Sequence, residues 1–353
     1  MKNKIISINY VTNLTIKLLS IMKRIILILL IAIFSIDLNA QQITEKEVSK
    51  SGSFKAGKFK KAPKKLYINS FNVYFQVFGS ARASTSGGEM LGTLKGNTNV
   101  AMGVFLDGVD NGDFQEITNK VYDRYVNNLK ELGYEIITAD EAGKTEELSD
   151  WVRKEGGNIN AAQSVGFVKV TPENYAYFVK RETNKGKEKS GFFANTAALS
   201  KELDDAVIAD VNMTFYFVQM KTFDNEFIGY SKVSGKPNFH FARLLGDINN
   251  QVLSSANYAF GKNLTSTEAA INSTIKKGVW SNKEVFEKGL KFKESAAAAS
   301  KSIPNYASVI FVNNANMSAS HYMPCNPELY KSETERMMNE FLDVSLNRLA
   351  ENL

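Results

Sequence analysis

A single cysteine, Cys325, and only two histidines, His240 and His321, occur among the 353 residues of the chain. One cysteine excludes an intramolecular disulfide and any metal site built from several cysteines. The histidines lie far apart in the sequence, and a zinc site would need carboxylates from elsewhere in the chain. The sequence therefore predicts no metal site and no cofactor.

Sequence motifs for catalysis are also absent. The chain has no GxSxG, GxGxxG, phosphate-binding P-loop or HExxH sequence. The acidic run from Asp107 to Asp113 has calcium-ligand residues at some loop positions, but Val109 and Thr118 stand where oxygen ligands are needed. We interpret this run as a turn before a helix. A Cys325–His321 nucleophile pair is an alternative to a buried, inert cysteine, and no catalytic residue is predicted.

Net positive charge is concentrated at the N-terminus. The formal charge is +6, but residues 1–40 carry five Lys or Arg residues and one Asp, so +2 remains for the rest of the chain. A strong positive field is what nucleic-acid binding requires. Nucleic acid is therefore not an expected partner.

The first 40 residues predict an export signal. Lys23-Arg24 precedes an apolar run at residues 25–36, and the small residue Ala40 follows at a suitable cleavage position. The run is short for a membrane span. We expect cleavage before Gln41, with Met22 as an alternative start, and an exported protein that is periplasmic, associated with the outer membrane or extracellular. An uncleaved N-terminal anchor is the alternative. No cysteine lies at the cleavage position, so a lipid anchor is not expected.

Periodicity predicts an α/β or α+β fold, with a mixed sheet flanked by helices and a long C-terminal helix. Strands are predicted at Leu66–Phe78, Asn99–Leu106, Tyr134–Thr138, Gly166–Val170, Tyr175–Lys180, Ala206–Met220, Phe227–Val233 and Ser308–Val312. One long helix is predicted from Asp113 to Leu132, and a separate short helix is predicted to end at Leu203. Further helices are predicted from Phe241 through Leu253 to Ile275, at Asn282–Lys291, at Ala296–Ala299 and from Pro327 onward. Asp113 is the expected N-cap and Gly133 the expected C-terminal stop of the first long helix.

Composition divides the chain into three parts. Residues 1–40 form the signal peptide, and residues 41–65 are rich in lysine and glycine and are predicted to be a basic linker. Residues 66–353 form one α/β domain, with candidate inserted segments at 79–106 and 160–200. The segment at 79–96 is expected to be a flexible loop or a weak hairpin.

The order of elements resembles a small α/β domain of bacterial envelope proteins. The strand LYINSFNVYF at Leu66–Phe75 precedes the long helix, which is followed by LGYEII at Leu132–Ile137 and later by LDDAVIADV at Leu203–Val211. This pattern is similar to the domain shared by the curli secretion channel subunit, the lipoprotein activators of penicillin-binding proteins and the N-terminal domain of TolB. The signal peptide resembles those of secreted proteins from Bacteroidota. The resemblance implies a role in the cell envelope.

Three function classes stay open. The favoured one is a non-catalytic exported envelope protein that binds a partner protein or assembles with itself. The second is a secreted hydrolytic enzyme with a carboxylate site that the sequence does not identify. The third is a pore-forming or channel subunit, in which segments 79–106 and 160–180 would insert as hairpins.

Alternation along the strand at Ala206–Met220 predicts where a partner would bind. Odd-numbered residues from Val207 to Phe217 are apolar, whereas the even-numbered positions from 210 to 216 are polar or aromatic. We expect the polar face to bind the partner through Asn212, Thr214 and Tyr216, together with Tyr230 on the return strand. Burial of this face under helices is the alternative.

Overall fold

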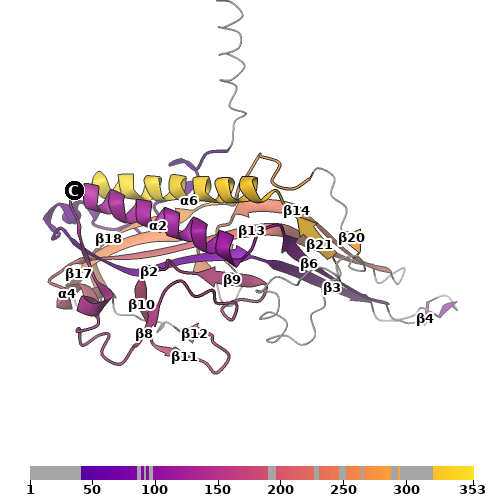
Figure 1. The fold of residues 1–353 in the computed structure, drawn as a ribbon, viewed down its shortest axis with the longest axis horizontal. Helices are drawn as coiled ribbons and strands as arrows, with labels where there is room; N and C mark the ends of the chain where they lie inside the picture. The colour runs from indigo at the N-terminus through magenta and orange to yellow at the C-terminus, as the bar shows by residue number, and fades with distance from the viewer. Residues whose placement is uncertain are drawn as a thin grey trace, which may run out of the picture. The chain divides into compact units, whose positions relative to one another are not determined.

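The fold is mixed α/β, as the periodicity predicts (Figure 1). The computed structural model describes residues 41–85, 89–90, 93–94, 98–189, 196–225, 230–245, 252–263, 266–287, 293–294 and 321–353. The largest sheet among the described residues is mixed and has nine strands. These strands are β1 (Val48–Ser49), β2 (Lys65–Gln76), β7 (Glu135–Ile137), β9 (Phe167–Val170), β13 (Val207–Asn225), β14 (Tyr230–Phe241), β17 (Ser255–Asn263), β18 (Ser266–Ile275) and β19 (Val279–Trp280).

Strand β13 organises the main sheet because it is 19 residues long and pairs with three neighbours. It runs parallel to β2 over Val207–Phe215 and antiparallel to β17 over Ile208–Asn212. Beyond Phe215 it pairs with β14 in a long hairpin. Its odd-numbered residues from Val207 to Phe217 are all fully buried, which confirms the predicted core face.

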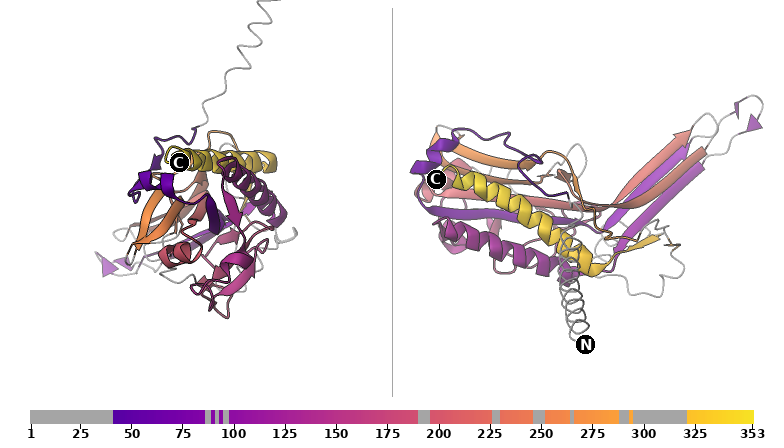
Figure 2. Two further views of the ribbon diagram at one scale, coloured as in Figure 1. Left: turned by 90° about the vertical axis from the view of Figure 1, so that its left-hand side faces the viewer. Right: turned by 90° about the horizontal axis from the view of Figure 1, so that it is seen from above.

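Helices α2 (Asn111–Glu131) and α6 (Pro327–Ala350) pack side by side over that core face (Figures 1 and 2). Phe114 of α2 stacks on Phe75 at 4.6 Å, and Phe341 of α6 meets Phe241 edge-on at 5.3 Å. Each helix thus buries an aromatic stripe against the sheet.

The ends of α2 show one correction. Its N-cap is Asp110, not the predicted Asp113: the Asp110 carboxylate accepts from the Gly112 and Asp113 backbone N–H groups, and Asp113 completes a capping box as the third helical residue. Gly133 follows the C-cap with φ of 86°, as expected of a residue that ends a helix in the left-handed conformation.

Two hairpins run side by side away from the helix pair (Figure 2). One is β13–β14, and the other is formed by β3 (Phe78–Thr85) and β6 (Thr98–Asp107). Strand β6 also pairs with β21 (His321–Pro324), which leads into α6 and pairs with β20 (Lys293–Glu294). Gly79 permits the hairpins to touch, because a Cβ atom there would lie 2.4 Å from Val218 Cγ1.

The opposite face of the main sheet is covered only in places. Near its end, α3 (Ala139–Ala142) and α4 (Thr196–Glu202) form a small apolar cluster with Tyr67 and Ile208. Further along β13, the short pair β15 (Leu244–Leu245) and β16 (Val252–Leu253) covers Tyr74. Strand β10 (Ala176–Val179) pairs with β8 (Val152–Glu155), and β11 (Arg181–Glu182) with β12 (Glu188–Lys189). Within segment 160–180, β9 pairs with β2 and β10 with β8, so these two strands do not pair with each other.

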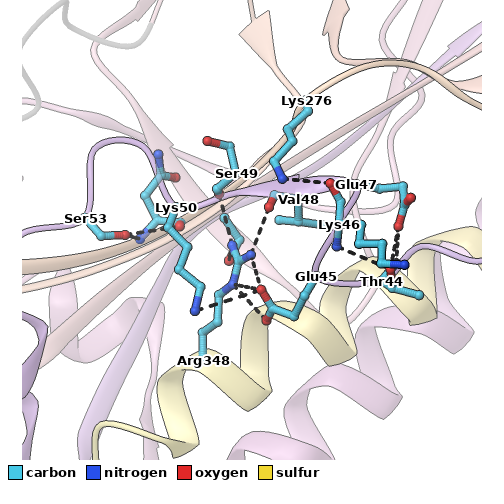
Figure 3. A network of polar contacts seen from close by, with 12 residues as sticks. Thr44, Glu45, Lys46, Glu47, Val48, Ser49, Lys50, Ser53, Lys276 and Arg348 are labelled. Atoms are coloured by element: carbon cyan, nitrogen blue, oxygen red, sulfur yellow. Dashed lines mark hydrogen bonds and ion pairs between the residues drawn. The ribbon is translucent and has the colours of Figure 1, made fainter.

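The predicted linker at 41–65 differs from the structure, in which residues 42–64 pack onto the domain. Val48 pairs with Ile275 on β18, and Phe59 of the 3₁₀ helix η1 (Ala56–Lys61) is buried edge-on against Phe260 at 4.8 Å. Arg348 of α6 donates hydrogen bonds to the Glu45 carboxylate and the Val48 carbonyl, and so holds this segment against the domain (Figure 3). The lysines face solvent while a few apolar side chains anchor the backbone.

The predicted helix from Phe241 to Ile275 is wrong, because this region forms strands β15 to β18. Residues 282–287 form no helix either, and the predictions at 296–299 and 308–312 lie outside the described residues. Among the helices that the structure describes, none is long and apolar enough to cross a membrane.

Candidate functional site

Polar side chains cross the face of the main sheet opposite α2 and α6 in two rows. Along β13 from Ile208 to Tyr216 this face presents the even-numbered residues, because side chains alternate between the faces of a strand. One row contains Ser70, Asp210, Asn257 and Asn272, and the next contains Asn72, Asn212, Ser255 and Thr274. Asn and Asp are depleted in strands, so strand formation alone does not explain these rows.

Asp210 occupies an irregularity in the pairing of β2 and β13. The register shifts between Ala209 and Asp210, and Asn69 becomes the extra residue. Asn69 Nδ2 and Ser70 Oγ each donate to Asp210 Oδ1 at 2.8 Å. Burial raises the pKa of Asp210, and the two hydrogen bonds oppose that rise. This carboxylate is therefore held by its neighbours at a fixed place in the sheet.

Three aromatic rings stack across adjacent strands farther along the same face. Tyr216 of β13 lies opposite His240 of β14, and His240 lies opposite Trp280 of β19. The ring centroids are 5.2 Å apart in both pairs, with interplanar angles of 17° and 20°. Phe167 of β9 meets Tyr216 edge-on at 5.0 Å. We call Phe167, Tyr216, His240 and Trp280 the aromatic row.

Asn238 fixes the His240 and Trp280 rings of the aromatic row. Trp280 Nε1 donates to Asn238 Oδ1 at 2.8 Å, and His240 Nδ1 lies 2.9 Å from the Asn238 carbonyl oxygen. A carbonyl oxygen only accepts, so Nδ1 carries the hydrogen of this contact. Burial lowers the pKa of His240, which favours the neutral ring.

Gln76 joins the aromatic row to the hairpin. Its side-chain Oε1 accepts from the backbone N–H groups of Phe217 and Val218 at 3.1 and 3.2 Å. These N–H groups lie just beyond the last β13 residue that pairs with β2. The amide side chain thus replaces the missing strand partner where β13 leaves β2.

A cavity of about 490 Å³ opens at the aromatic row. Its lining residues are Gln76, Phe78, Gly79, Ser80, Val165, Gly166, Phe167, Tyr216, Val218, Gln219, Met220, Asn238, His240 and Trp280. None of them is Asp, Glu, Lys or Arg. Val165 and Trp280 at this cavity are 57% and 46% exposed, although both are large apolar residues. The cavity therefore combines flat aromatic surface with amide and hydroxyl groups, and its lining carries no formal charge among the residues that the structure describes.

The structure separates the four residues predicted to contact a partner. Tyr216 lines the cavity, and its hydroxyl donates to the Leu244 carbonyl at 3.2 Å. Asn212 belongs to a polar row and accepts from Asn72 Nδ2 at 3.0 Å. Thr214 lies between them but is 0% exposed, because β15 and β16 cover this part of the sheet, so it cannot contact a partner. Tyr230 begins β14 opposite Asn225, about 30 Å along the hairpin from Tyr216 at about 3.3 Å per residue.

A second, smaller cavity of about 270 Å³ is polar. Glu188 and Tyr177 line it: Glu188 forms a buried ion pair with Lys169, and Tyr177 Oη donates to Glu188 Oε1 at 2.9 Å. Lys169 Nζ also donates to Tyr177 Oη at 3.2 Å. Burial lowers the pKa of Lys169. Lys169, Tyr177 and Glu188 thus satisfy one another's hydrogen bonds, as in a structural network. Under the enzyme hypothesis, this cluster is the best candidate for a catalytic site.

Cys325 is not arranged as a nucleophile. Burial raises the pKa of its thiol to about 12, so the thiolate is scarce at neutral pH. Its backbone N–H donates to the Asp107 carbonyl at 2.8 Å, which places it in the turn that leads to α6. Across the described ranges, no three His, Cys, Asp or Glu side chains are grouped so that they could bind a metal ion.

Sequence reasoning found part of the aromatic row. The alternation Phe239-His240-Phe241 predicts that His240 lies on the outer face, and both phenylalanines are buried as expected. Nothing in the sequence associates Trp280 or Phe167 with Tyr216, because these contacts arise from pairing between strands distant in sequence. Comparison with protein-family models, with curated proteins and with solved structures gave no match.

Proposed function

We propose that this chain is an exported, non-catalytic binding protein of the cell envelope that holds its partner on the face of the main sheet opposite α2 and α6. The observation that carries the proposal is the uncharged cavity at the aromatic row, where Trp280 is 46% exposed. Trp and Tyr are the residues that most often dominate binding energy at interfaces. Exposed large apolar residues grouped at one cavity favour a binding role over simple solvent exposure.

Preorganisation supports the same conclusion. The indole of Trp280 is stacked on His240 and hydrogen-bonded to Asn238, so it is held in one orientation before a partner arrives. Fixing a side chain in advance lowers the entropy lost on binding. If the stack of Tyr216, His240 and Trp280 only stabilised the fold, burial of the Trp280 ring would serve that purpose better than the 46% exposure observed.

Export is proposed from the first 40 residues. The exported protein is expected to begin at Gln41, and mass spectrometry of protein recovered from the envelope or the medium checks this. Recovery of intact residues 25–40 in a soluble cytoplasmic form would contradict it.

A capture experiment tests the binding role. The purified protein is immobilised and exposed to solubilised envelope material, both protein and polysaccharide, and the same is done with Trp280→Ala. Phe54→Ala is the matched control, because Phe54 is a large apolar residue with 41% exposure that does not line the cavity. We expect Trp280→Ala to lose captured material that wild type and Phe54→Ala retain. Identical capture by all three proteins would show that the cavity is not the binding surface.

A second candidate is an assembly subunit that uses the paired hairpins. The observation behind it is that β3–β6 and β13–β14 run together away from the helix pair (Figure 2). Exposed basic residues follow their strands, namely Arg82, Lys221, Lys232 and Lys236. Assembly through these residues should weaken with salt. Sedimentation of wild type and of Lys221→Glu/Lys236→Glu at low and high salt tests this, and a monomer at every salt concentration would reject it.

A further inference from the structure

The lining of the large cavity indicates which class of ligand it accepts. The 14 lining residues that the structure describes lack a formal charge, apart from the titratable ring of His240. A phosphate, sulfate or carboxylate group that entered this space would lose water and would find no cation among these lining residues. Nucleotides and nucleic acids need cations for their phosphates. The ligand that fits is therefore neutral.

The same lining contains two kinds of surface that a neutral ligand must match. Tyr216, Trp280 and Phe167 provide aromatic rings, whereas Gln219 and Asn238 provide amides. Gln76 Oε1 accepts hydrogen bonds from the hairpin backbone, so the side-chain NH₂ group is the part that can donate to a ligand. Few neutral molecules present both a flat apolar face and a dense set of hydroxyl groups. A sugar ring does, since its C–H face stacks on an aromatic ring while its hydroxyls bond to amides.

We infer that the cavity at the aromatic row is a binding site for a neutral carbohydrate, with Trp280 as the stacking platform and Gln219, Asn238 and Gln76 as hydrogen-bonding groups. This inference rests on the proposed binding function and names its ligand. The volume of about 490 Å³ lies within the range of about 300–1,000 Å³ typical of small-molecule sites. The open side at Val165 and Trp280 lets a longer chain continue into solvent.

A peptide partner fits the cavity less well. Extended peptides usually bind by adding a strand to a sheet edge, where backbone groups are unpaired. The floor of this cavity instead consists of β13 and β14 side chains, and both strands are already paired over Phe215–Asn225. The Phe217 and Val218 N–H groups, which β2 does not reach, are already bonded to Gln76. A peptide that lay on this floor would therefore contact side chains rather than the unpaired backbone of a sheet edge.

Fluorescence at Trp280 gives a direct test. Trp151 and Trp280 are the two tryptophans of the chain, so Trp151→Phe leaves Trp280 as the reporter. The probes are neutral hexasaccharides (β-1,4-glucan, β-1,4-linked N-acetylglucosamine and mannan) and, as the charged counterpart, oligogalacturonate. We expect at least one neutral probe to shift the Trp280 emission and to bind in calorimetry, whereas oligogalacturonate does not bind.

Variants separate the cavity from other surfaces. Trp280→Ala and Gln219→Ala should each weaken binding of the neutral probe about tenfold or more, while Phe54→Ala should not change it. Ser80→Trp fills the cavity from an exposed position and should abolish binding while the circular dichroism spectrum stays that of wild type. This last variant keeps the test valid even if Trp280→Ala were to unfold.

The outcomes distinguish this inference from the proposed function. Binding of oligogalacturonate in preference to the neutral probes overturns the inference. Capture of envelope protein that depends on Trp280, with no carbohydrate bound, also overturns it but supports the proposed binding function. Absence of both carbohydrate binding and Trp280-dependent capture rejects the inference and the function together.

Discussion

Arg348, near the end of α6, forms a bidentate ion pair with Glu45, which lies 303 residues earlier in the chain (Figure 3). The Arg348 side chain is 3% exposed, and its guanidinium also donates to the Val48 and Ser49 carbonyls and to Ser273 Oγ, each at 3.0 Å. One side chain thus joins the C-terminal helix, the N-terminal segment and β18. This contact explains how a lysine-rich segment becomes part of the folded domain.

Removing this guanidinium should destabilise the fold. We expect Arg348→Met to lower the free energy of unfolding by about 2–4 kcal/mol, because two carbonyls and a hydroxyl lose their donor and Glu45 loses its partner. The control is Arg124→Met, whose ion pair with Asp343 is solvent-exposed on both sides and should be worth less than about 1 kcal/mol. Urea unfolding followed by circular dichroism compares them. Equal losses would show that the Arg348 network contributes no more than a surface pair.

The same ion pair predicts a pH dependence. The hydrogen bond from Arg348 is the main cause that lowers the pKa of Glu45 below 4.5. A carboxylate with a depressed folded-state pKa stabilises the fold fully above its unfolded pKa, and this contribution is lost as the pH falls through the folded value. The stability difference between wild type and Glu45→Gln should therefore shrink as the pH falls below 4.5. A difference that stays constant down to about pH 3 would contradict this linkage.

Regular periodicity explains which elements the sequence predicts correctly. The stripe of α2 and the alternation of β13 each span many residues, and their buried faces agree with the structure. The sequence predicts a helix where strands β17 and β18 form, and their Ala residues favour a helix over a strand. Their inward residues, such as Tyr258 and Ile271, alternate with period two, but their identity as strands depends on pairing with β13 and with each other.

The candidate site was only partly predictable for a related reason. Alternation of apolar and polar residues along β13 and β14 places Tyr216 and His240 on the face away from the core. It does not reveal that β15 and β16 cover the part of the sheet that contains Thr214. Trp280 joins the row through a two-residue strand with no pattern of its own. Short strands and short covering segments are specified by tertiary contacts, so a local pattern does not reveal them.

The stripe of α2 can be tested with one buried residue. Val121 is fully buried between α2 and the sheet, and we expect Val121→Asp to cost at least about 3 kcal/mol because it introduces an unpaired buried charge. Asn127→Asp, on the exposed side of the same helix, should change stability by less than about 0.5 kcal/mol. Thermal melts of the two variants decide the point, and similar melting temperatures would mean that Val121 does not face the core.

His240 should remain neutral at neutral pH. Its folded-state pKa is lowered from 6.5 by burial, so the unfolded chain takes up a proton before the folded chain does. Stability should therefore fall as the pH drops below 6.5. In His240→Gln that part of the pH dependence should disappear. NMR titration of the ring, assigned by comparison with this variant, measures the pKa directly, and a value at or above 6.5 would refute the prediction.

The buried pair Lys169–Glu188 provides the test of the enzyme hypothesis. Both side chains are less than a tenth exposed, so Lys169→Met should leave Glu188 as an uncompensated buried charge and cost about 3–5 kcal/mol. Adding Glu188→Gln should recover much of that loss, because the amide oxygen can still accept from Tyr177 Oη while the buried charge is gone. A structural network predicts that the double variant folds and keeps its binding to the envelope partner. If wild type hydrolysed an esterase or glycosidase substrate and the folded double variant did not, the cluster would be catalytic, and the proposal of a non-catalytic binding protein would fail.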